Sequence, residues 1–297
     1  MPELPDLQVF RGNLQKRFAG KTLQSFTIYN SKKLNTSEER CKEELEGQWL
    51  KNVKRHGKEL YFEFSNKAVL GIHLMLKGYF VELPNDEVTD PILELQFEGG
   101  KGLAVVDSMA LARLNLNPKK PTAPDALDYQ FNVKYLQDKL QKNPGVPIKS
   151  FLIDQKIVRG IGNAYVDEIL WEAKISPFSH TELLPDNALR ELHRQIKIVL
   201  KEGEEKIKII NPDIIAGEIR DFMKIHHPDK THSPTGAEIL VQKLNKRKTY
   251  YTKEQVDYLP VVVAPTKKTT TQKRVTKKPA ARKANQTKKT VLDDLPF

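Results

Sequence analysis

The chain has 297 residues, a single cysteine at Cys41, a formal net charge of +11 and a pI near 9.4. This length suits two domains with a tail, and one cysteine excludes both an internal disulfide framework and a cysteine zinc site within one chain. No apolar stretch approaches membrane-spanning length, so we expect no membrane contact and a location in the cytoplasm or nucleoid.

The positive charge is concentrated near the C-terminus. Residues 265–297 contain ten Lys or Arg and two Asp, so they carry +8 and leave about +3 for the rest of the chain. Composition alone therefore predicts a basic tail that favours a polyanionic partner. An argument for DNA binding must come from the remainder of the sequence.

The first five residues, Met1-Pro2-Glu3-Leu4-Pro5, suggest unusual chemistry. A methionine before proline is expected to be removed, which leaves a free proline amine next to a carboxylate. An α-amino group ordinarily has a pKa of roughly 7.7–8, so part of it is a neutral nucleophile near neutral pH. A secondary amine condenses with an aldehyde to give an iminium cation, and Glu3 could then exchange protons beside it. The ordinary alternative is a proline at the start of a helix.

An amphipathic helix is predicted directly after this segment, ending at Gly20. Its apolar positions recur at spacings of three and four. They are Leu4, Leu7, Phe10, Leu14 and Phe18. Asp6 lies in the first turn, where the helix dipole explains a carboxylate as well as a functional role does.

The next stretch, from Lys21 to about Val106, predicts a β-sandwich interrupted by a short acidic helix near 37–45. Its expected strands are short and rich in β-branched or aromatic residues. They cover 22–29, 48–53, 60–64, 69–74, 79–83, 92–97 and 103–106. Arg55-His56-Gly57-Lys58 forms a basic turn between two of them, where Lys58 is either a solvated charge or a phosphate contact.

A proline-rich linker over 116–124 precedes a helical region with predicted helices at 132–142, 147–152, 163–173 and 185–203. Gly160-Ile161-Gly162 directly precedes the third of these helices. Backbone amides in such a turn and at a helix N-terminus can bind an anion, so the turn suggests a phosphate clamp. A simple tight connection between helices is the alternative.

These motifs together resemble the bacterial formamidopyrimidine-DNA glycosylase and endonuclease-eight-like family of bifunctional DNA repair enzymes. The resemblance spans about 2–255. Three stretches carry it: the opening Pro2–Pro5, the basic turn ending at Lys58 with the later His73-Leu74, and the helix-two-turn-helix segment 152–168. The implied fold is α+β: an N-terminal helix and β-sandwich, then a helical domain with the helix-two-turn-helix and a finger hairpin.

The resemblance implies a DNA glycosylase with abasic-site lyase activity in base excision repair, acting on a base flipped out of the helix. Pro2 would attack the anomeric carbon through a Schiff base, Glu3 would move protons, and Lys58 and Asn163 would hold phosphates. Gly160 and Gly162 belong to the same DNA-binding turn. His73 and Asp6 would support the site. Glu168 would either support it or brace the N-terminal segment.

The C-terminal finger departs from the family pattern because its four cysteines are absent. A four-thiolate zinc site is therefore impossible, and His226, His227 and His232 lack partners at metal-ligand spacing. We expect no metal and no other cofactor. The segment resembles the zincless finger of some members, in which hairpin packing positions Arg247 against a phosphate.

The loops that would fill the gap left by a flipped base also differ from the family pattern. The family often has a methionine and an Arg-Arg-Phe motif, whereas this chain has Leu76 and Met109-Ala110-Leu111. Asp6 replaces a usual glutamate. We therefore expect cleavage to vary little with the base opposite the lesion, and the need for duplex rather than single-stranded DNA stays open.

The expected domain boundaries are 1–116 for the helix and sandwich, 117–124 for the linker, 125–225 for the helical domain, 226–260 for the finger hairpin and 261–297 for a disordered basic tail. The tail ends in Asp293-Asp294-Leu295-Pro296-Phe297, similar to the tip of bacterial single-stranded-DNA-binding proteins. It is either a contact for a repair or replication protein or a solvated end.

We expect a monomer. A non-catalytic lesion-binding protein and a DNA-architectural protein are the alternative functions, and both would tolerate a blocked Pro2.

Overall fold

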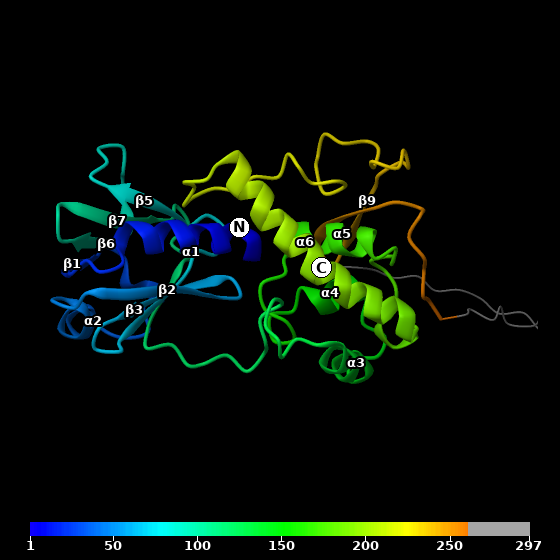
Figure 1. Cartoon of the computed structure of the whole chain (residues 1–297), viewed down its shortest axis with the longest axis horizontal. Coiled ribbons are helices and arrows are strands. Elements are labelled where there is room, and N and C mark those ends of the chain that lie inside the picture. Colours follow the sequence, from blue (N-terminus) through cyan, green and yellow to red (C-terminus); the bar gives the residue numbers. More distant parts are fainter. Residues whose placement is uncertain (261–297) are drawn as a thin grey trace, which may run out of the picture. The chain divides into compact units, whose positions relative to one another are not determined.

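The computed structural model describes residues 1–260, and the tail predicted for 261–297 lies outside the described residues. Eight strands in the first 116 residues form two antiparallel four-stranded sheets (Figure 1). One sheet has the order β1-β6-β7-β5 and the other has the order β2-β3-β4-β8. Their bounds are β1 Leu23–Ile28, β2 Leu50–His56, β3 Glu59–Phe64, β4 Val69–His73, β5 Tyr79–Leu83, β6 Pro91–Phe97, β7 Lys101–Val106 and β8 Arg113–Leu116.

Helix α1 (Leu4–Phe18) joins this sandwich to the helices that follow. The five residues of the predicted apolar stripe are all at most 1% exposed, which confirms the amphipathic interpretation. Leu7, Phe10, Leu14 and Phe18 pack in the core of the sandwich, whereas Leu4 belongs to the separate core of the helical region. One helix is therefore anchored in two hydrophobic cores, and this fixes the position of the N-terminal residues between them.

The helical region contains four α-helices: α3 (Val133–Gln141), α4 (Ile148–Leu152), α5 (Asn163–Glu172) and α6 (Asp186–Ile210). A short α2 (Glu38–Leu45) and the 3₁₀ turns η1 (Ser31–Lys33) and η2 (Thr181–Leu183) complete the helices described. Helices α4 and α5 with the turn between them correspond to the predicted helix-two-turn-helix. No helix within residues 1–260 combines the length and apolar character needed to cross a membrane.

The finger is a two-stranded antiparallel hairpin of β9 (Leu240–Leu244) and β10 (Arg247–Tyr251). Side chains of β9 are mostly exposed, whereas Thr249 and Tyr250 of β10 are buried. Strand β10 therefore forms the inner side of the hairpin. The predicted α+β class is confirmed, and the predicted finger segment forms a hairpin.

Two elements differ from the sequence prediction. Strand β8 was missed because it is only four residues long, yet it pairs with β4 and completes the second sheet. Helix α6 continues seven residues beyond Gly203, where the predicted helix ended. A Cβ on Gly203 would lie 2.7 Å from the Tyr165 hydroxyl, so this glycine makes room for a neighbouring ring and does not end the helix.

Candidate active site

The N-terminal segment is bound to the turn between α4 and α5. The Leu4 amide donates a hydrogen bond to the Gly160 carbonyl over 3.1 Å. A Cβ on Gly160, whose φ is +106°, would lie 2.6 Å from the Leu4 side chain. Pro2 and Glu3 are buried as a result. Because the two segments are 156 residues apart in sequence, a folded helical region is required to place Pro2.

Glu3 accepts a hydrogen bond from the first turn of α5. Its Oε1 lies 2.9 Å from the Ala164 amide, and the side chain is only 4% exposed. Its Oε2 is buried and has no hydrogen-bond partner within residues 1–260. The helix N-terminus stabilises the carboxylate through one oxygen and leaves the other available for proton exchange.

Lys58 lies beside Glu3 at Gly162. A Cβ on Gly162 would lie 2.3 Å from the Glu3 carboxyl carbon and 2.4 Å from the Lys58 ammonium nitrogen. Lys58 is 6% exposed, and its ammonium makes no ion pair with the described residues. Burial lowers the pKa of Lys58, while the charge of Glu3 opposes that shift. A desolvated cation without a fixed partner is suited to bind a phosphate.

The basic turn that carries Lys58 is clamped to the helical region. Asp125 forms a two-pronged ion pair with Arg55 and accepts the Gly57 amide at 2.8 Å. Arg159 donates to the His56 carbonyl over 3.0 Å. Sequence reasoning missed this clamp, because nothing local to Asp125 indicates a partner 70 residues earlier.

Asp6 is the most buried carboxylate of the segment at 1% exposure. It accepts the Glu3 amide at 2.8 Å, which closes the first turn of α1. It also forms a bidentate pair with Arg220, with nitrogen–oxygen distances of 2.6 and 2.8 Å. Burial alone would lower the pKa of Arg220, but the hydrogen bonds and charge of Asp6 raise it. This pair ties the 211–224 segment to the N-terminus, and no local sequence pattern predicts it.

Glu3 and Lys58 line a cleft of about 570 Å³. Met1, Glu3, Lys58, His73, Asn163 and Arg247 are among its lining residues. In this structure Met1 is present, so the Pro2 nitrogen is a peptide nitrogen and the terminal amine of Met1 pairs with Glu218. Five of the sequence-predicted site residues thus meet in this cleft, although they come from the N-terminus, the sandwich, α5 and the hairpin: Glu3, Lys58, His73, Asn163 and Arg247. Pro2 lines a neighbouring hollow with Leu76 and Glu218.

His73 lies at the edge of the cleft as a neutral group. Its Nδ1 accepts the Met75 amide at 3.0 Å. Burial lowers the pKa of His73 to about 4, and the charges of Lys58, Arg113 and Arg159 act in the same direction. The negative charge of Glu59 opposes this shift. A neutral imidazole in this position organises the loop that carries Leu76.

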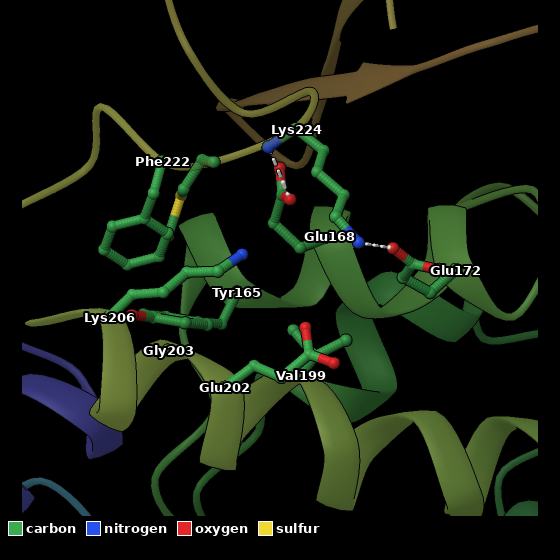
Figure 2. Close-up of a pocket in the computed structure, with 10 residues that line it drawn as sticks. Tyr165, Glu168, Glu172, Val199, Glu202, Gly203, Lys206, Phe222 and Lys224 are labelled. Atoms are coloured by element: carbon green, nitrogen blue, oxygen red, sulfur yellow. Dashed lines mark hydrogen bonds and ion pairs between the residues drawn. The ribbon is translucent and has the colours of Figure 1, made fainter. Parts of the chain in front are cut away.

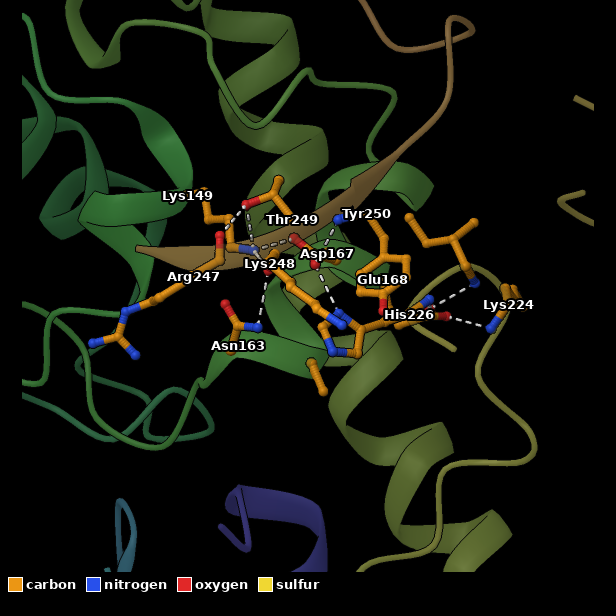
Figure 3. Close-up of polar contacts among 12 residues, drawn as sticks. Lys149, Asn163, Asp167, Glu168, Lys224, His226, Arg247, Lys248, Thr249 and Tyr250 are labelled. Atoms are coloured by element: carbon orange, nitrogen blue, oxygen red, sulfur yellow. Dashed lines mark hydrogen bonds and ion pairs between the residues drawn. The ribbon is translucent and has the colours of Figure 1, made fainter. Parts of the chain in front are cut away.

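Asn163 and Arg247 both line the cleft, Asn163 from α5 and Arg247 from β10. The Asn163 amide nitrogen donates to the Lys248 carbonyl over 3.1 Å. Arg247, one residue earlier, points its guanidinium away from this contact (Figure 3). Its fork makes no hydrogen bond to the residues described and remains available to an anion.

The glycine turn is partly occupied. Gly160 donates its amide to Gln155 at 2.9 Å, and the Ala164 amide binds Glu3. The amides of Gly162 and Asn163 have no partner within the part of the chain that the structure describes. The sequence left all of these amides open to an anion, and the structure shows that the protein's own Glu3 takes one of them.

Glu168 lies away from the cleft, beside a small pocket between α5 and α6 (Figure 2). Its carboxylate accepts the backbone amides of Lys224, Ile225 and His226 at 2.7–2.8 Å. It therefore braces the 224–226 segment and does not touch the N-terminal residues.

The expected void-filling residues separate in space. Leu76 is 56% exposed and lines the cleft. Met109 is 51% exposed, and its loop wraps around Asp107, which accepts the amides of Met109, Leu111 and Ala112. Ala110 adopts a φ of +49° and lines a different surface hollow.

Within residues 1–260 there is no group of three or more His, Cys, Asp or Glu side chains that could hold a metal ion. His226 instead binds Asp167 through Nδ1 at 2.7 Å.

Comparison with known proteins gives a consistent result. Residues 1–114 match the model of the formamidopyrimidine-DNA glycosylase N-terminal domain, and residues 122–211 match the model of the formamidopyrimidine-DNA glycosylase H2TH domain. A formamidopyrimidine-DNA glycosylase of Protochlamydia amoebophila is 34% identical over 68% of this chain and 76% of its own length. One from Pediococcus pentosaceus is 30% identical over 76% of this chain and 88% of its own.

Solved structures agree with these relatives. The complex of the Lactococcus lactis enzyme with abasic-site DNA superposes with a TM-score of 0.76 at 27% identity, covering 84% of this chain and 98% of that one. Its complex with DNA containing an oxidised pyrimidine gives the same TM-score at 28% identity, with the same coverage. The chain therefore belongs to the formamidopyrimidine-DNA glycosylase family.

Proposed function

We propose that this protein is a DNA glycosylase of base excision repair with abasic-site lyase activity, and that the Pro2 nitrogen is its nucleophile. Removal of Met1 would free this nitrogen within the segment that the turn at Gly160 holds in place. One observation carries the proposal most strongly. Next to Pro2, the Glu3 carboxyl has one oxygen held by α5 and the other buried without a partner.

The reaction follows from these positions. The neutral amine of Pro2 attacks the anomeric carbon of the damaged nucleotide, and the bond from that carbon to the base breaks. Glu3 donates a proton to the ring oxygen, so the sugar opens to an iminium. The iminium withdraws electrons from the sugar, a proton leaves the adjacent carbon, and the bond to the 3′ phosphate breaks.

DNA phosphates are the ligands we assign to the free cations of the cleft. Lys58 offers a desolvated ammonium, and Arg247 offers a planar fork that matches a phosphate. The solved neighbours from Lactococcus lactis are complexes with abasic-site, Fapy-dG and oxidised-pyrimidine DNA. We infer the same substrate class here, abasic sites and oxidised bases in DNA, and a location with the chromosomal DNA in the cytoplasm.

A comparison of two N-termini tests the proposal. Protein with a trimmed N-terminus should nick a duplex that contains one abasic site, and protein with a retained N-terminal tag should bind the duplex but fail to nick it. The alternatives are a lesion-binding protein without catalysis and a DNA-architectural protein. Both predict that the trimmed and tagged forms bind the duplex equally and that neither form nicks it. Full nicking by the tagged form would contradict the role of Pro2.

A further inference from the structure

A buried charge network connects the helix-two-turn-helix to the hairpin (Figure 3). Lys149 on α4 and Asp167 on α5 lie 2.8 Å apart, and each is only 1% exposed. Burial lowers the pKa of Lys149, which Asp167 opposes. Two charges removed from water in this way require strong compensation from hydrogen bonds.

The compensation comes from the backbone and side chains of β10. The Lys149 ammonium donates to the Lys248 carbonyl and to the Thr249 hydroxyl, both at 2.9 Å. Asp167 accepts the Tyr250 amide at 3.1 Å. Three successive residues of β10 are therefore held by one ion pair, directly after Arg247.

The same pair also fixes the segment before the hairpin. Asp167 binds His226 at 2.7 Å, and the next residue, Glu168, accepts the amides of 224–226. The side chains of the other strand, β9, are largely exposed, and the hairpin's apolar support is a small cluster in which Tyr250 packs with Trp171, Ile225 and Ile239. No metal-ligand group is available to it within residues 1–260.

We propose that Lys149 and Asp167 are positioning residues for Arg247: their buried ion pair holds the inner strand of the hairpin and so aims the arginine at a DNA phosphate. This inference rests on the proposed function only for the identity of the ligand. The holding of the strand itself is independent of DNA and can be measured on the free protein.

The test needs a variant that keeps the fold. Lys149→Met alone leaves the buried Asp167 carboxylate without its ammonium partner and risks unfolding. The double variant Lys149→Met/Asp167→Leu replaces both charges by apolar groups of similar size. Proteins often tolerate such a replacement of a buried ion pair. Lys142→Met is the matched control, because Lys142 is exposed and lines neither the cleft nor the network.

Hydrogen exchange of the free, full-length protein gives the first readout. The Tyr250 amide should exchange about tenfold faster or more in the double variant, because its acceptor Asp167 is gone, and its exchange should be unchanged in the control. Unchanged protection of β10 in a folded double variant would overturn the inference. Addition of a chelator should leave the exchange of wild type unchanged, and a chelator-sensitive β10 would also overturn it.

Binding to a duplex with a non-reactive abasic analogue gives the second readout. Arg247→Ala should weaken binding roughly 10- to 100-fold and lower the salt slope by about one unit. The double variant should show the same loss and the same slope. The triple variant, with all three changes, should be no weaker. Additive losses would overturn the inference while leaving the glycosylase function intact, because wild type would still bind the analogue more tightly than undamaged duplex. Wild type without that preference would instead overturn the proposed function.

Discussion

Gly162 and Glu3 lie so close that the site has no room for a side chain at position 162. A Cβ there would be 2.3 Å from the Glu3 carboxyl carbon and would also meet Lys58. The second glycine of the turn is therefore required for the packing of the Glu3 carboxylate. The Gly-x-Gly pattern therefore has a steric reason in addition to anion binding by its backbone amides.

Gly162→Ala should displace Glu3 and slow nicking at an abasic site by about 100-fold or more, the contribution of a general acid–base group. Overpacking should also cost about 1–3 kcal/mol of stability. The control is Gly12→Ala, which lies in α1 with nothing within 4 Å of its Cβ. That variant should be as active as wild type. Normal nicking by Gly162→Ala would show that Glu3 is not confined as described.

The Asp6–Arg220 pair should contribute strongly to stability because Asp6 is almost inaccessible. Arg220→Met leaves its carboxylate buried and unpaired, which should cost about 3–5 kcal/mol in urea unfolding. The double variant Asp6→Asn/Arg220→Met should recover part of this loss.

An exposed pair provides the control. Arg194→Ala removes the partner of Glu191 on α6, where the arginine side chain is 59% exposed. Its cost should stay below about 1 kcal/mol. Equal costs for Arg220→Met and Arg194→Ala would contradict the role assigned to the buried pair.

His73 should make stability depend on pH in a defined window. Its pKa is about 4 in the folded protein, against 6.5 ordinarily, so the fold favours the neutral ring. Its contribution is therefore fully present above pH 6.5 and is lost as pH falls from 6.5 through 4, by at most about 3 kcal/mol.

His73→Asn tests this, because the asparagine oxygen can accept the Met75 amide without titrating. The loss of unfolding free energy between pH 7 and pH 4 should be smaller in the variant than in wild type. Identical losses in the two proteins would mean that His73 titrates normally in the fold.

Much of the fold follows from local sequence patterns. The apolar stripe of α1 and most strands of the sandwich were predicted close to their observed bounds, because burial on one face leaves a period in the sequence. Strand β8 was missed because four residues carry too little pattern. Gly203 was misread as a helix end because composition does not reveal the Tyr165 ring that it accommodates.

The candidate site was only partly predictable, for a related reason. Pro2, Glu3, Lys58, Asn163 and Arg247 stand in recognisable motifs. The structure brings the last four to one cleft and places Pro2 in a neighbouring hollow that shares Leu76 and Glu218 with it. The partners that hold them do not stand in motifs. Arg220 is 214 residues from Asp6, and Lys149 and Asp167 look like ordinary helix charges until their burial is known. Long-range ion pairs have no local periodicity from which they could be inferred.

The central claim is that the Pro2 nitrogen forms a covalent iminium with the opened sugar. Borohydride trapping on a strand with one abasic site tests it most directly, with trimmed wild type beside Pro2→Gly and Glu3→Gln. The account predicts a stable protein–DNA adduct with wild type that is lost or greatly weakened in Pro2→Gly. It also predicts slower adduct formation in Glu3→Gln. Absence of an adduct from correctly trimmed wild type, or an undiminished adduct from Pro2→Gly, would contradict it.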